Sequence, residues 1–154
     1  MKQIEILARL QGIRRFREER AEAELGDKRR STRKAKEAVD EKAALRASHL
    51  AEAEAAEGRR LRTMTGAIVD ASSLQELEAQ RSGSARRTEQ FAAEERSAQS
   101  DLEQSLDRLG EAQNRYKRLR ASGLKLEELI KLSKARASGR SQGGSADDNE
   151  EWPF

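Results

Sequence analysis

The chain has 154 residues, of which 38% are charged and 3% aromatic, and its mean hydropathy is −0.96. Three Phe, one Trp and one Tyr are too few to build the core of a compact domain, and the lack of cysteine excludes disulfides and thiolate metal sites. The net charge of +3 is a small difference between 31 basic and 28 acidic residues, so we expect a solvated helix surface that carries many ion pairs.

A first helix is predicted from about Lys2 to Met64, because helix formers dominate this stretch. At its start Ile6, Leu10 and Ile13 share one face. A weaker apolar stripe follows, formed by Leu25, Thr32, Ala35, Val39 and Ala53, and four polar residues fall on the same stripe: Lys28, Lys42, Arg46 and His49. Small side chains let a partner helix approach closely but bury little area, so we expect this packing to be weak.

A turn is predicted at about residues 65–73. Gly66 stands where the C-cap of the first helix belongs, and Ser73 with Glu76 has the Ser-x-x-Glu form of a capping box. The helices on either side are each roughly 60 residues long, about 90 Å at 1.5 Å per residue. Equal lengths around a short connector favour an antiparallel hairpin, with a parallel dimer of two bent helices as the alternative.

A second helix is predicted from about residue 74 to 137, because one seam continues through it at alternating steps of three and four for roughly nine heptads. A repeat of 3.5 residues held this long is typical of a helix that winds around a partner. The fold class we expect is all-α: a long two-helix antiparallel coiled-coil hairpin over residues 1–137. The seam consists of Leu74, Leu77, Arg81, Ser84, Thr88, Phe91, Glu95, Ala98, Leu102, Ser105, Leu109, Ala112, Tyr116, Leu119, Gly123, Leu126, Ile130, Ser133 and Ala137.

The composition changes at residue 138. Residues 138–145 are rich in Gly and Ser and are typical of a flexible linker, and residues 146–154 combine acidic residues with Trp152, Pro153 and Phe154. We expect a disordered tail over 138–154. It is either a solubilising segment or a short linear binding motif.

Nothing in the sequence predicts an enzyme, a metal site or a cofactor. There is no Gly-rich phosphate-binding turn, and His49 stands alone on a polar helix stretch. A basic cluster raises the alternative of a nucleic-acid-associated coiled coil, but glutamates flank it closely: its members are Lys28, Arg29, Arg30, Arg33, Lys34 and Lys36. No apolar run has the length of a membrane span and Met1 opens no signal peptide, so we expect a soluble cytoplasmic protein.

The N-terminal segment has the form Leu10-x-x-Ile13, followed by Arg-x-Glu-Arg-Ala-Glu over residues 17–22. Further along, Tyr-Lys-Arg-Leu at residues 116–119 leads to Leu-Glu-Glu-Leu at residues 126–129. Together with the chain length, the hairpin and the polar C-terminal segment, this resembles type III secretion proteins of the YscO/FliJ kind, the central stalk of the export ATPase. The early second helix departs from that family, because residues 80–87 are polar and contain Gly83.

The resemblance implies a non-enzymatic stalk at the inner membrane. In that family the end that carries both termini inserts into a hexameric ATPase, the turn reaches toward the cytoplasmic ring of the export gate, and some members bind secretion chaperones. The residues in the ATPase-binding position here are Ile6, Leu10, Ile13, Arg14, Arg17 and Arg20 with Leu126, Ile130, Lys131 and Lys134. Leu74, Leu77 and Arg81 occupy the gate-binding position, where plain seam packing is the alternative role for both leucines. A generic scaffolding coiled coil is a further alternative.

Overall fold

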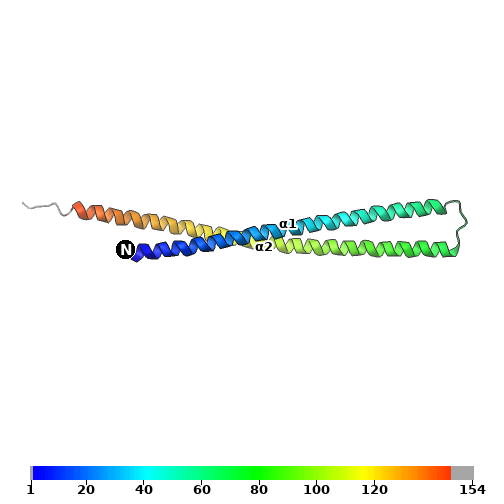
Figure 1. Cartoon of the computed structure of the whole chain (residues 1–154), viewed down its shortest axis with the longest axis horizontal. Helices are drawn as coiled ribbons and strands as arrows, with labels where there is room; N and C mark the ends of the chain where they lie inside the picture. Colours follow the sequence, from blue (N-terminus) through cyan, green and yellow to red (C-terminus); the bar gives the residue numbers. More distant parts are fainter. Residues whose placement is uncertain (1, 147–154) are drawn as a thin grey trace, which may run out of the picture. The chain divides into compact units, whose positions relative to one another are not determined.

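The computed structural model describes residues 2–146, with side chains as far as Ser141. It consists of two helices, α1 (Lys2–Met64) and α2 (Ala71–Ala146), which pack antiparallel in a hairpin (Figure 1). This confirms the predicted all-α hairpin. Within the described residues neither helix contains a stretch that is long and apolar enough to cross a membrane.

The hairpin divides into two units, each made of one segment from either helix. The terminal unit comprises Met1–Lys28 and Leu109–Phe154, and the turn unit comprises Arg29–Arg108. In the turn unit the antiparallel pairing is visible in the cross-helix contacts, since Thr32 contacts Ser105 and Glu57 contacts Arg81.

The predicted seam of α2 is confirmed over most of its length. Every predicted member from Ser84 to Ser133 is buried or half-buried, and so is Leu77. Leu74, Arg81 and Ala137, at or near the two ends of the series, are exposed instead. One seven-residue repeat therefore fixes which face of α2 meets α1.

The weaker stripe of α1 is also confirmed, and the three apolar residues before it lie on a different face of the helix. The seam side chains from Leu25 to Ala53 are buried or half-buried, whereas Ile6, Leu10 and Ile13 point to solvent. Steps of seven residues back from Leu25 lead to residues 18, 11 and 4, which are half-buried in the seam. The second series of seam positions here consists of residues 21, 14 and 7. The beginning of the seam therefore consists of Ile4, Leu7, Gln11, Arg14, Glu18 and Ala21.

The turn begins at a glycine with a left-handed backbone. Gly66 has φ of +82°, a conformation that costs L-residues with a side chain about 1–2 kcal/mol. The last turn of α1 is closed by the Thr65 N–H, which donates to the Leu61 carbonyl at 3.0 Å. Gly66 therefore ends α1, as the sequence predicts.

Asp70 caps the start of α2, not Ser73. Its Oδ1 accepts from the backbone N–H of Ser73 at 2.9 Å and from the Ser73 hydroxyl at 2.7 Å. Both hydrogen bonds hold the pKa of the Asp70 carboxyl below its ordinary value, and the bond from the Ser73 hydroxyl has the larger effect. The predicted capping box at Ser73 is therefore wrong, because Asp70 lies three residues earlier and supplies the acceptor at the N-cap.

The far end of α2 also differs from the expectation. The helix continues through the Gly/Ser-rich residues 138–145 to Ala146, where a flexible linker was expected from residue 138. Extending an existing helix costs much less than nucleating a new one, which accounts for the continuation into a sequence of weak helix formers. The remainder of the expected tail, residues 147–154, lies outside the described residues.

Candidate functional site

In the terminal unit an ion pair between α1 and α2 shows which residues of the two helices lie side by side along one flank of the seam. Arg115 donates to both carboxylate oxygens of Glu24, at 2.8 and 2.9 Å. Fourteen residues, or two heptads, before Glu24 is Leu10, and fourteen residues after Arg115 is Leu129. Because the helices are antiparallel and share a seven-residue repeat, Leu10 and Leu129 occupy the same flank as that ion pair.

This flank is apolar and exposed. Leu10 is 43% exposed and Leu129 is 55% exposed, in a region where the seam itself is formed by other residues. The neighbouring positions on the same side are also apolar, so that the terminal flank consists of Ile6, Leu10, Ile13, Leu129 and Leu132, all exposed. An apolar stripe that the partner helix does not cover marks a surface for another protein.

Seven residues away from four members of the terminal flank, the residues at the equivalent heptad positions are basic. Arg17 and Arg20 follow Leu10 and Ile13 by seven residues on α1, while Lys125 precedes Leu132 and Arg136 follows Leu129 on α2. All four are exposed. The terminal flank therefore suits a partner that combines apolar and acidic groups.

The structure divides the predicted ATPase-binding residues into four groups. Leu10 and Ile13 belong to the terminal flank, and Arg17 and Arg20 are its basic neighbours. Ile6 is also in the flank, whereas three of the predicted residues lie half-buried in the seam: Arg14, Leu126 and Ile130. Lys131 and Lys134 are exposed but occupy positions outside the flank.

Sequence reasoning missed Leu129 and Leu132. A signal for them was present: Ile6, Leu10 and Ile13 do not fit the heptad register of Leu25 and the residues after it. Apolar residues outside the register indicate a second stripe on the same helix, and the aligned positions of α2 are then expected to be apolar as well.

A second group of exposed apolar side chains lies at the turn. Leu61 at the end of α1, Ile68 in the connector and Leu74 in the first turns of α2 are all exposed, and Ile68 makes almost no contact with the rest of the chain. Of the predicted gate-binding residues, Leu74 belongs to this group. Leu77 is buried in the seam, and Arg81 is paired with Glu57 through its Nε at 2.7 Å and its Nη2.

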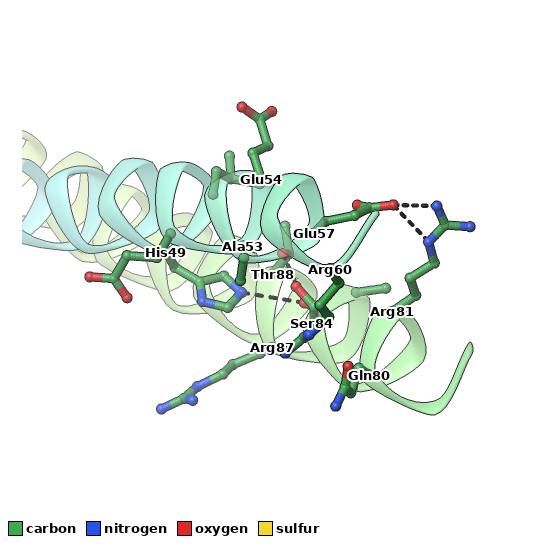
Figure 2. Close-up of a pocket in the computed structure, with 15 residues that line it drawn as sticks. His49, Ala53, Glu54, Glu57, Arg60, Gln80, Arg81, Ser84, Arg87 and Thr88 are labelled. Carbon is green, nitrogen blue, oxygen red and sulfur yellow. Dashed lines mark hydrogen bonds and ion pairs between the residues drawn. The ribbon is translucent and has the colours of Figure 1, made fainter. Parts of the chain in front are cut away.

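The turn unit also contains an open groove of about 640 Å³ between the helices (Figure 2). Small residues of the seam line it, which leave space that larger side chains would fill: Ala53, Ala56 and Ser84. The Nε2–H of His49 donates to the Ser84 carbonyl at 3.3 Å, and Figure 2 shows the Glu57–Arg81 ion pair bridging the two helices. The His49 ring also packs against Phe91, with 5.2 Å between centroids, so its role here is structural.

Polar pairs replace apolar layers in the seam beside this groove. Lys42 contacts Glu94 and Arg46 contacts Glu95, each at 3.1 Å. Pairs of this kind add little stability because they remain partly exposed, but they disfavour a shifted alignment of the helices. The turn unit therefore has a specified register and a weak core.

Among the described residues no group of three His, Asp or Glu side chains is arranged to hold a metal ion. No protein-family model, no curated protein and no solved structure matches this chain. What the molecule itself shows is a two-helix hairpin with exposed apolar surfaces, consistent with a coiled coil that binds a protein partner.

Proposed function

We propose that the chain is the non-enzymatic central stalk of a bacterial type III secretion system, of the YscO/FliJ kind. In this role the terminal unit inserts into the hexameric export ATPase and the turn contacts the cytoplasmic ring of the export gate. The protein then acts in the cytoplasm, peripherally at the inner membrane, and secretion chaperones are further candidate partners.

The terminal flank is the observation that carries the proposal. It presents five exposed apolar side chains from the two helices, in the unit that contains the start of α1 and the end of α2. A stalk that is held inside a ring needs a surface of this kind at its inserted end, because apolar burial provides most of the binding energy.

The arginines beside the flank suit the same role. Arg17 and Arg20 are exposed one heptad from Leu10 and Ile13. Guanidinium groups bind carboxylates through two parallel hydrogen bonds, so acidic side chains in the lumen of a ring are their natural partners. The apolar residues then provide affinity and the arginines orientation.

The turn supplies a separate surface for the second partner. Ile68 and Leu74 are exposed at the connector and belong to the turn unit. A chain with one binding surface in each unit has the organisation required to link two proteins. Leu77 supports this surface from the seam, where its side chain is buried.

The proposal is tested by the ATPase rate of the cognate hexamer with and without the purified chain. The wild-type chain is expected to raise the rate, and the double variant Arg17→Glu/Arg20→Glu is expected to raise it less while retaining its helix content. The matched control is Arg86→Glu/Arg87→Glu, which reverses two exposed arginines of the turn unit.

Absence of stimulation, together with absence of co-purification with the ATPase or the gate, contradicts the proposal. The generic scaffold would then remain. A nucleic-acid-associated coiled coil is recognised in the same preparation by binding to random duplex DNA whose affinity falls steeply across a salt series.

The gate contact is tested separately with Leu74→Ser. This residue is 55% exposed, so the substitution is expected to leave the hairpin folded and to reduce capture of the gate ring without changing ATPase stimulation. Leu106→Ser, at a similarly exposed leucine away from the turn, is the control. Equal capture by both variants excludes Leu74 from the contact.

A further inference from the structure

The terminal flank repeats along each helix with the spacing of a coiled-coil seam. On α1 its members lie at residues 6, 10 and 13, and the exposed Arg17 and Arg20 continue the same alternation of four and three residues. On α2 the same alternation runs through Arg118, Ser122, Lys125, Leu129, Leu132 and Arg136. The flank is therefore a second seven-residue repeat on both helices, beside the one that joins them.

This second repeat is rotated around each helix in a constant way. Every apolar member immediately precedes a seam residue, as Leu10 precedes Gln11 and Leu129 precedes Ile130. One residue turns an α-helix by about 100°, so the flank lies about 100° around each helix from the seam. Since the ion pair that joins the two helices lies on this flank, the stripes of α1 and α2 face the same side of the hairpin. A third helix laid along that side contacts both of them.

Charge is divided between the two sides of the terminal unit. The positions of the flank from residue 6 to 20 and from 118 to 136 hold five apolar residues, five basic residues and one serine, and none is acidic. The acidic residues that immediately follow a seam residue, and so lie on the opposite side, are Glu5, Glu19, Glu22 and Glu127. The flank therefore attracts acidic groups along its whole length.

The combination of apolar and basic residues selects among possible occupants. A nucleic acid offers phosphates to the basic residues but leaves Leu10 and Leu129 without an apolar partner. A second copy of the hairpin covers the leucines but brings the basic residues of two flanks together. An amphipathic helix with acidic residues beside its apolar stripe satisfies both groups.

The length of the flank sets the length of that helix. Ile6 and Arg20 are 14 residues apart and Arg118 and Arg136 are 18 residues apart, about 21 and 27 Å at 1.5 Å per residue. A partner helix of three heptads, about 31 Å, covers this span. On α2 the leucines lie between Lys125 and Arg136, so acidic groups are needed toward both ends of the partner helix.

We propose that the terminal flank binds an acidic amphipathic helix of another protein, which adds a third strand to the coiled coil of the terminal unit. Leu10 and Leu129 border the groove between α1 and α2 and hold the apolar stripe of that helix, and the basic residues of the flank pair with its carboxylates. The inference concerns the form of the partner and not its identity, so it goes beyond the proposed role in secretion and does not rest on it.

The probe is a synthetic peptide of three heptads with Leu at both seam positions, Glu on either side of them, and Ala and Gln elsewhere. Its glutamates repel one another, so the free peptide does not pair with itself. A fluorescein label reports binding to the full chain by anisotropy, and circular dichroism reports the helix that the peptide gains. A peptide of the same composition in scrambled order and a peptide with Lys in place of Glu are the controls. We expect saturable binding of the acidic peptide at least roughly tenfold tighter than binding of either control.

The double variant Leu10→Ser/Leu129→Ser removes the two leucines without touching the seam and is expected to weaken binding by roughly tenfold or more. The control Leu45→Ser/Leu106→Ser changes two leucines of similar exposure in the turn unit and is expected to bind as the wild type does. Circular dichroism verifies that both variants retain the helix content of the wild type.

Three results overturn the proposal. The scrambled peptide binds as tightly as the acidic one, or the flank variant binds the acidic peptide as tightly as the wild type does, or the chain ignores the peptide and instead binds phosphatidylglycerol vesicles through the same two leucines. The last result assigns the flank to a lipid surface. Failure of ATPase stimulation leaves the inference standing, since no ATPase is present in this experiment.

Discussion

Leu25 is the most informative position at which to test how the hairpin is held together. Its side chain is 5% exposed, and the seam register places it opposite Ala112, which is 3% exposed. Leu25→Ala removes three carbon atoms at about 0.8 kcal/mol each, or about 2.4 kcal/mol of transfer free energy. The cavity contribution is small, because in a two-helix packing the neighbouring side chains and water can fill the space. We expect a loss of about 2.5 kcal/mol in the free energy of unfolding.

Leu106→Ala is the matched control, since it makes the same chemical change at a side chain that is 50% exposed. Half of its surface is already in water, so we expect a loss of about 1 kcal/mol. The difference of about 1.5 kcal/mol corresponds to roughly a tenfold difference in the unfolding equilibrium constant.

The measurement is urea unfolding followed by far-ultraviolet circular dichroism, with the denaturant slope of each variant compared with that of the wild type. An unchanged slope shows that only stability has changed. If both variants lose the same free energy, burial in the seam does not determine the stability of the hairpin and the reasoning is refuted. A slope that falls in Leu25→Ala alone also contradicts it, because the two units then unfold separately.

Three further predictions concern the turn unit. Gly66→Ala is expected to lower the free energy of unfolding by about 1 kcal/mol, because Gly66 has a φ of +82°. Gly83→Ala is expected to raise it by about 0.5–1 kcal/mol, because Gly83 lies in mid-helix with open space around it. Thermal unfolding compares the two variants, and melting temperatures that shift in the same direction would contradict the argument. The pKa of Asp70 is lowered, so its contribution to stability is present above the ordinary value of 3.8 and is lost as the pH falls through its folded pKa. In an acid titration the wild type should therefore have more helix than Asp70→Asn at neutral pH, and this difference should shrink at low pH. A difference that stays constant with pH would contradict this. Arg81→Ala breaks an exposed ion pair with Glu57 and is expected to cost less than about 1 kcal/mol in urea unfolding, so that a larger loss would show Arg81 to be part of the core.

The sequence by itself determined the seam of α2. Side chains from Ser84 to Ser133 recur in one register without interruption, and a helix can present only one continuous seam to a single partner. The end of α1 at Gly66 was likewise readable, because glycine is favoured where the backbone becomes left-handed. Each of these features depends on residues of one helix alone, so it can be read without knowing how the partner helix packs.

The start of α2 was only partly readable. Asp70 and Ser73 are both good N-cap residues, and Ser73 has the additional Glu three residues later. The preference of each residue does not say which of them supplies the acceptor. The structure decides for Asp70, whose carboxylate accepts two hydrogen bonds from Ser73.

Only the tertiary structure decided which face of early α1 meets α2. Judged locally, Ile6, Leu10 and Ile13 are a better core than Gln11, Arg14 and Glu18. The helix cannot rotate its seam partway along its length, so the long register set by Leu25 and the residues after it prevails over the more apolar beginning. The polar residues are therefore drawn into the seam and the apolar ones are left at the surface. That conflict between local hydrophobicity and the register of the whole helix creates the terminal flank, the surface on which the proposed functions depend.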